Sequence, residues 1–82
     1  MNRAEVTEKL NGIFRKNFED DALVITDTLS ANDVEKWDSL SHIKLISTVE
    51  NEFGIKFKLK ELIAMKNVGD LINYIESKLA AK

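Results

Sequence analysis

Cysteine and proline are both absent from this sequence of 82 residues, and it contains one histidine. Without cysteine no disulfide can form, and a single histidine cannot supply the ligands of a structural zinc site. Residues 1–5 have no apolar stretch of the kind found in a signal peptide, and no apolar run approaches the ~20 residues of a membrane span. We therefore expect a cytoplasmic protein with no metal site and no membrane span.

Acidic and basic residues nearly balance, since 14 Asp and Glu against 12 Lys and Arg give a net charge of −2. A nucleic-acid-binding domain usually has a basic face, so this balance argues against nucleic acid as a partner. The charges are unevenly distributed, because the formal charges of residues 19–38 sum to −6 and those of residues 55–66 sum to +3. The length predicts a single domain over residues 1–82, and so small a domain counts against an enclosed active site.

Apolar residues recur at helical spacing in three segments. The first helix is predicted over residues 4–17. The second begins after the N-cap residue Asp38 and ends before Gly54, and the third begins after the N-cap residue Asn67, with Asp70 completing a capping box. The apolar stripes are Val6, Leu10, Ile13 and Phe14 in the first, Leu40, Ile43, Leu45, Ile46, Val49 and Phe53 in the second, and Val68, Leu71, Ile72, Ile75 and Leu79 in the third.

Two connecting segments complete the predicted fold. Residues 58–65 are long enough for a short helix, and Ile55 and Phe57 before it are interpreted as buried anchors in a loop, since no partner strand is evident. Residues 19–38 lack helical periodicity and predict a long loop, which needs ordered anchors. The expected anchors are Val24, Ile25, Leu29 and Trp37. The predicted fold is all-α, a small four-helix bundle with three principal helices, a short third helix and a long first loop.

Ser39 has the most suggestive position for chemistry, because it directly follows Asp38 at the start of the second helix. A phosphate on its hydroxyl would lie near backbone N–H groups and the positive end of the helix dipole, worth about 0.3–1 kcal/mol. Spacing alone favours a plain helix-start serine. A hydrolase built on Ser39 and His42 lacks an orienting group and an oxyanion site, so we interpret His42 as a partner contact or a solvated side chain. We interpret Trp37 as a packing anchor.

Asp38-Ser39-Leu40 and the residues after it resemble the acyl carrier protein family. The resemblance extends over nearly the whole chain, with residues 67–75 matching the fourth helix of that family. It implies that Ser39 carries 4′-phosphopantetheine and that Asp38 contacts magnesium in the complex with a phosphopantetheinyl transferase. The matching residues after the motif are Ile43, Leu45, Ile46, Val49, Glu50, Glu52, Phe53, Gly54 and Ile55.

The resemblance implies a non-catalytic carrier whose arm holds acyl groups as thioesters and delivers them in fatty-acid, polyketide or related lipid biosynthesis. The expected partners are the transferase, an acyl-activating ligase or acyltransferase, and a ketosynthase or other acyl-processing enzyme, and the carrier is expected to be a monomer. Two alternatives stay open. The cargo could be an amino acid, as in D-alanyl carrier proteins, or the chain could be an unmodified helical module that binds a partner helix.

The charges of this sequence depart from the family pattern around the second helix. Ser41 and Lys44 stand where carriers of the general fatty-acid pathway usually have acids, which indicates a specialised member. Further lysines follow where many members of the family have acids or a proline, although these could simply be solvated: Lys56, Lys58 and Lys60. The residues expected to contact partners are Asp33, Glu35, Leu40, Ser41, Lys44 and Glu50. The resemblance also implies an acyl pocket between the second and third helices. Its expected lining, which could equally be ordinary core, is Ile46, Val49, Leu62, Ile63 and Ile72.

Overall fold

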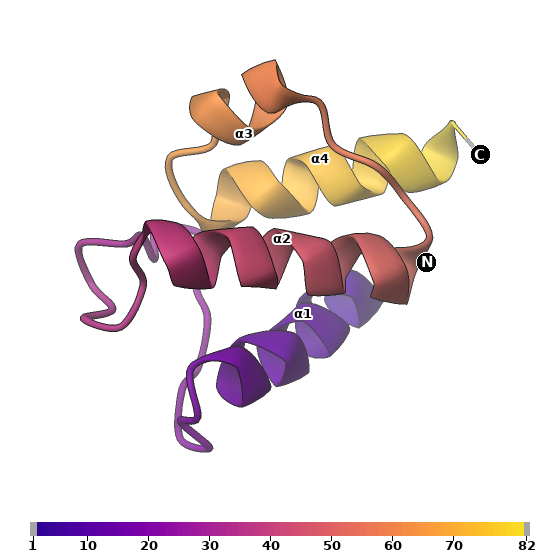
Figure 1. The fold of residues 1–82 in the computed structure, drawn as a ribbon. Coiled ribbons are helices and arrows are strands. Elements are labelled where there is room, and N and C mark those ends of the chain that lie inside the picture. The colour runs from indigo at the N-terminus through magenta and orange to yellow at the C-terminus, as the bar shows by residue number, and fades with distance from the viewer. Residues whose placement is uncertain (1, 82) are drawn as a thin grey trace.

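The structure, a computed structural model, describes residues 2–81 and contains four helices there: α1 (Arg3–Asn17), α2 (Ser39–Phe53), α3 (Leu59–Ala64) and α4 (Val68–Ala80). No strand occurs in this part of the chain. In Figure 1, α2 and α4 lie between α1 and the short helix α3, and the long first loop extends past the start of α2. The all-α prediction is confirmed. None of the four helices described combines the length and apolar character that a membrane span requires.

Side-chain caps fix the starts of α1 and α2, and a glycine fixes the end of α2. The Asp38 carboxylate accepts a hydrogen bond from the backbone N–H of Ser41 at 2.9 Å, and the Ser41 hydroxyl accepts one from the N–H of Asp38 at 2.9 Å. Gly54 ends α2 with φ of 64°, a left-handed conformation that glycine adopts at little cost. Helix α1 begins one residue earlier than predicted, because the Asn2 side chain accepts from the N–H of Glu5 at 2.9 Å.

The start of α4 is capped as predicted by Asn67, whose side-chain oxygen accepts from the N–H of Asp70 at 2.9 Å. The predicted capping box was wrong, because it would pair the Asp70 carboxylate with the N–H of Asn67. Asp70 instead accepts from the N–H of Lys66 at 3.0 Å. The same turn holds the first loop in place, because the N–H of Val68 donates to the carbonyl of Leu29 at 2.9 Å.

One apolar core joins α1, α2 and α4. Its helical members are Val6, Leu10, Ile13 and Phe14 of α1, Leu45, Ile46, Val49 and Phe53 of α2, and Val68, Leu71, Ile72 and Ile75 of α4. The predicted stripe of α2 was wrong at Leu40 and Ile43, which are 79% and 68% exposed. Successive helical residues turn by about 100°, so burying Leu45 together with Ile46 rotates the core face away from both.

The first loop is anchored by fewer residues than predicted. Ile25 is buried, and its N–H donates to the side-chain oxygen of Asn11 at 2.7 Å. Leu29 and Trp37 pack partly buried against the core, which confirms them as anchors. Val24 is 64% exposed, so it is not an anchor. Adjacent side chains of an extended segment point in opposite directions, and burial of Ile25 therefore turns Val24 outward.

Candidate functional site

Ser39 is the first residue of α2 and is exposed to solvent. Among residues 2–81 its hydroxyl has no hydrogen-bond partner. The hydroxyl of Ser41, two residues later, is fully engaged, since it donates to the carbonyl of Lys36 at 2.8 Å and accepts from the N–H of Asp38 at 2.9 Å. Of these two serines, Ser39 is the one whose oxygen is available for modification.

Asp38 directly precedes Ser39 in the sequence and is also exposed. The hydrogen bond from the backbone N–H of Ser41 holds the pKa of Asp38 below its usual value of 3.8. An ionised carboxylate next to a serine that receives a phosphate is a suitable ligand for Mg²⁺, which prefers carboxylate and phosphate oxygens. Residues 2–81 form no group of three or more potential metal ligands, so Asp38 would share such an ion with another molecule.

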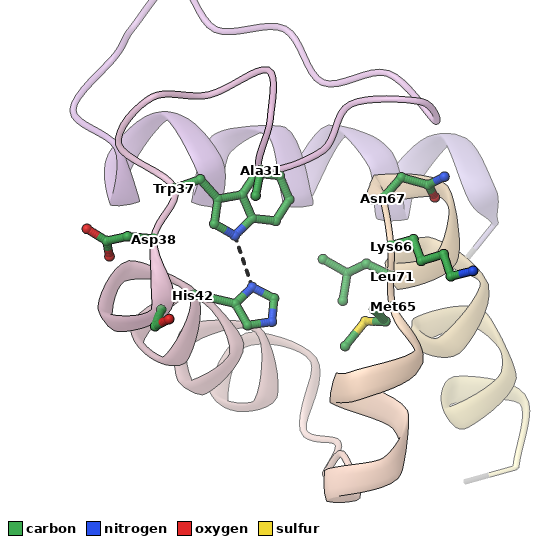
Figure 2. A pocket seen from close by; sticks show the side chains of 9 residues that line it. Ala31, Trp37, Asp38, His42, Met65, Lys66, Asn67 and Leu71 are labelled. Atoms are coloured by element: carbon green, nitrogen blue, oxygen red, sulfur yellow. Dashed lines mark hydrogen bonds between the residues drawn. The ribbon is translucent and has the colours of Figure 1, made fainter.

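A cavity of about 370 Å³ opens next to Ser39, within the size range of small-molecule pockets. Its walls come from the first loop, the start of α2, the segment between α3 and α4, and the first turn of α4. In Figure 2, Trp37 and His42 face Met65 and Leu71 across the cavity, whereas the ammonium group of Lys66 points away from it. The lining residues are Ala31, Trp37, Asp38, Ser39, His42, Met65, Lys66, Asn67 and Leu71.

His42 is tied to Trp37 at the wall of this cavity. The indole N–H of Trp37 donates to Nδ1 of His42 at 3.0 Å, and burial lowers the pKa of His42 from 6.5. The interpretation of His42 as a solvated side chain was wrong, because it is half-buried and its Nδ1 is paired. Trp37 packs against Phe14 and Phe18 with ring centroids 5.3 and 5.8 Å apart, which confirms it as a packing anchor.

The predicted partner-contact residues fall into two groups. Asp33, Glu35, Leu40 and Lys44 are exposed. Ser41 and Glu50 are instead used inside the chain, Ser41 in the cap of α2 and Glu50 through its carboxylate, which accepts from the N–H of Phe57 at 2.8 Å. That bond holds the segment after α2, where Ile55 is buried and Phe57 partly buried, and confirms both as anchors.

The predicted acyl-pocket residues do not line the cavity beside Ser39. Ile46, Val49 and Ile72 belong to the closed core, with 5%, 0% and 1% of their surface exposed. Leu62 packs partly buried against that core. Ile63 is 74% exposed, contrary to the expected position between two helices, because its side chain lies on the outer face of the short helix α3.

Sequence reasoning missed the apolar side chains that do line this cavity. Met65 was included in the short third helix and Leu71 in the stripe of α4, and neither was assigned to a pocket. The available signal was the position of Trp37 and His42, two residues before and three residues after Ser39. Because α2 begins at Ser39, Trp37 just before the helix and His42 in its first turn are both near enough to flank the Ser39 hydroxyl.

Comparison with known proteins identifies the family. The family model described as the phosphopantetheine attachment site matches residues 8–75. The chain is 33% identical over 82 residues to the acyl carrier protein of Thermosynechococcus vestitus, covering 99% of this chain and 100% of that protein. The solution structure of a holo acyl carrier protein from Geobacter metallireducens superposes with a TM-score of 0.89 at 49% identity, covering 93% of this chain and 87% of that one. The chain therefore belongs to the acyl carrier protein family, whose cofactor is 4′-phosphopantetheine.

Proposed function

We propose that Ser39 carries the 4′-phosphopantetheine arm and that the chain delivers acyl groups to partner enzymes. The observation that carries this proposal is the exposed, unpaired hydroxyl of Ser39 at the first residue of α2, within the matched residues 8–75. When bound, the arm supplies a terminal thiol that holds the acyl group as a thioester. The contribution of the chain is to position the attachment point and to present it to other proteins.

The surroundings of Ser39 fit such an arm. The N-terminal end of α2 favours the negative charge of a phosphodiester by about 0.3–1 kcal/mol. The adjacent cavity of about 370 Å³ offers apolar contacts from Trp37, Met65 and Leu71 to the arm or to a bound acyl group. His42 adds one hydrogen-bond donor there, because its Nδ1 accepts from Trp37 and its proton therefore lies on Nε2.

Activation of the Ser39 hydroxyl is proposed to come from a phosphopantetheinyl transferase. The Ser39 hydroxyl would attack the phosphorus of coenzyme A that bears the pantetheine arm, forming a phosphodiester and breaking the diphosphate bond. The hydroxyl proton would pass to a base of that enzyme, and adenosine 3′,5′-bisphosphate would leave. His42 is not available to take this proton, since its Nδ1 accepts from the indole of Trp37 and its Nε2 already has the proton. We assign Asp38 the role of holding Mg²⁺ in the transferase complex, which its exposed carboxylate and lowered pKa support.

The acyl-handling partners proposed for this carrier are an acyl-activating ligase or acyltransferase and a ketosynthase or other acyl-processing enzyme. We propose that they belong to a dedicated pathway. The support is the exposed Lys44 on α2, together with the engagement of Glu50 by the backbone of Phe57. Lys44 adds a positive charge to the exposed surface of α2, and the bond from Phe57 holds the Glu50 carboxylate against the chain.

Intact mass measurement tests the attachment directly. The protein is incubated with coenzyme A, Mg²⁺ and a promiscuous phosphopantetheinyl transferase, and we expect a gain in mass equal to one arm. Ser39→Ala should abolish the gain. The matched control is Ser47→Ala, which removes another exposed serine hydroxyl of α2 and should leave it intact. No gain in mass, or a gain that persists in Ser39→Ala, would contradict the proposal.

A further inference from the structure

Helix α3 exposes two large aliphatic side chains on one face. Leu59 is 73% and Ile63 74% exposed, and residues four apart on a helix lie on the same face. The opposite face is turned inward, because Leu62 packs partly buried against the core and the Glu61 carboxylate lies 2.9 Å from the ammonium group of Lys78 on α4. Helix α3 therefore has an apolar outer face, at the edge of the molecule that is remote from α1 (Figure 1).

Three exposed lysines lie next to this apolar pair. Lys60 is three residues from Ile63, so the two side chains are neighbours on the surface of α3. Lys58 directly precedes α3, and Lys56 and Lys58 are exposed on either side of Phe57, which packs against the core. None of these three lysines makes an ion pair within residues 2–81. Their ammonium groups are therefore available to anions of another molecule.

Nearby acids offset only part of this positive charge. Residues 55–66 contain one acid, Glu61, and the ammonium group of Lys78 neutralises it. The Asp70 carboxylate accepts from the N–H of Lys66, whose own positive charge balances it. Glu50 accepts at 2.8 Å from a backbone N–H of the segment before α3, so its negative charge also lies close by. With Glu50 counted, the three lysines keep a surplus of two positive charges.

The residue types of this surface favour a lipid bilayer over a protein as its partner. The centres of protein interfaces are enriched in Tyr, Trp and Arg and depleted in Lys, whereas this surface consists of lysine and aliphatic side chains. At a bilayer, aliphatic side chains enter the boundary of the acyl chains while the long stems of lysine keep their charges among anionic head groups. The acidic loop, residues 19–38, begins at the end of α1, across the molecule from α3 (Figure 1).

We propose that the outer face of α3 and the segment before it bind peripherally to bilayers that contain anionic lipids. The contact is weak and reversible, since each lysine near an anionic surface strengthens binding by about fivefold and salt screens the attraction. It goes beyond the proposed function and does not depend on it, because the arm on Ser39 takes no part in it. The residues of this surface are Lys56, Lys58, Leu59, Lys60 and Ile63.

Cosedimentation with vesicles tests the proposal. The holo protein is sedimented with phosphatidylglycerol vesicles and with phosphatidylcholine vesicles of the same size. We expect the partition coefficient to be about tenfold or more higher on the anionic vesicles and to fall as the salt concentration is raised. No binding, or equal binding to the two kinds of vesicle, would overturn the proposal.

Charge reversal at two of the lysines should remove the preference for anionic vesicles. The variant is Lys56→Glu/Lys60→Glu, and both positions are exposed. The matched control is Lys16→Glu/Lys36→Glu, which changes the net charge equally at two exposed lysines outside this surface and should keep the preference. An equal loss of binding in both double variants would mean that net charge alone governs binding, which contradicts a defined surface.

The apolar contribution has its own pair of variants. Leu59→Ser/Ile63→Ser should weaken binding to the anionic vesicles by about tenfold or more, because two aliphatic side chains no longer enter the bilayer. The matched control is Val24→Ser/Ile43→Ser, which removes two similarly exposed apolar side chains, 64% and 68% exposed, outside this surface. Wild-type binding by the α3 variant, or an equal loss in the control, would count against α3 as the contact.

Two further measurements separate this proposal from its alternatives. Ser39→Ala has no attachment point for the arm and should sediment with the anionic vesicles like the wild type, so a failure of the proposed function leaves this test intact. Binding that is lost in Ser39→Ala would overturn the proposal. Retention on immobilised poly-L-glutamate without sedimentation on phosphatidylglycerol vesicles would indicate an acidic protein as the partner and would also overturn it.

Discussion

The indole N–H of Trp37 donates a hydrogen bond to Nδ1 of His42 at 3.0 Å, and the two ring planes lie 23° apart with centroids separated by 6.0 Å. An imidazole that accepts at Nδ1 is neutral and has its proton on Nε2. A protonated imidazole has hydrogens on both nitrogens, so it would lose this bond. Burial lowers the pKa of His42 and acts in the same direction. The pair therefore links the charge of His42 to the packing of the loop before Ser39.

Titration of His42 should be visible in the fluorescence of Trp37, the one tryptophan of the chain. We expect a transition with its midpoint below the ordinary pKa of 6.5, because the folded state favours the neutral ring. The unfolded state binds the proton more readily, so stability is complete above 6.5 and declines as the pH falls from there through the folded pKa. His42→Phe keeps an aromatic ring and should remove both effects. A midpoint at or above 6.5, or a transition that persists in His42→Phe, would contradict this assignment.

Asp38 has two roles that substitutions can separate, one as the cap of α2 and one as the proposed Mg²⁺ contact. Asp38→Ala should lower the urea midpoint of unfolding, whereas Asp38→Asn keeps a capping oxygen and should nearly preserve it. The pKa of the carboxyl is lowered in the folded state, so its stabilisation is present above 3.8 and is lost as the pH falls below that value. This loss should be absent in Asp38→Asn.

Loading of Asp38→Asn by the transferase should nonetheless be slower by about tenfold or more, as for other weakened metal contacts. The initial rate of mass gain at saturating coenzyme A measures this effect, and the Mg²⁺ dependence should shift to higher concentration. A variant that folds normally and loads at the wild-type rate would leave Asp38 as a structural cap alone.

Local features of this fold were predictable from the sequence because neighbouring residues determine them. The caps Asp38 and Asn67 lie within three residues of the N–H groups that they bind, and Gly54 ends α2 through its own backbone conformation. Helical spacing likewise predicted the buried face of α1 and α4. These properties need no knowledge of how the helices pack.

Packing decided the features that the sequence did not reveal. The apolar residues of α2 cover more than one face, and packing of the helix into the core buries Leu45 and leaves Leu40 and Ile43 exposed. The cavity beside Ser39 needs the segment around Met65 to approach the start of α2, a contact between residues far apart in the sequence. The spacing of residues along one helix cannot predict that this segment lies near the start of α2.

The adjacent loop residues Val24 and Ile25 should respond very differently to truncation. Ile25 is 6% exposed and packs in the core, so Ile25→Ala should cost about 2–4 kcal/mol of unfolding free energy. Val24 is 64% exposed, and Val24→Ala should change stability by less than about 0.5 kcal/mol. Urea denaturation of both variants checks the contrast. Similar costs at the two positions would contradict the one-sided anchoring of the first loop.

Replacement by alanine should have opposite effects on stability at two of the glycines. Gly69 lies in the first turn of α4, its N–H donates to the carbonyl of Asp27 at 2.9 Å, and an added Cβ would meet that same oxygen at 3.0 Å. The hydrogen bond prevents the oxygen from moving aside, so Gly69→Ala should destabilise the fold by about 1–3 kcal/mol. Gly12 lies inside α1 with nothing within 4 Å of an added Cβ.

Gly12→Ala should therefore stabilise the protein by about 0.5–1 kcal/mol, because alanine loses less backbone entropy than glycine on forming a helix. Thermal unfolding of the two variants under one set of conditions shows whether each change raises or lowers the stability. A stabilising Gly69→Ala would mean that the loop around Asp27 can move away from α4. Since Val68 holds the same loop through the carbonyl of Leu29, hydrogen exchange at the N–H of Val68 and Gly69 would then be faster than in the wild type.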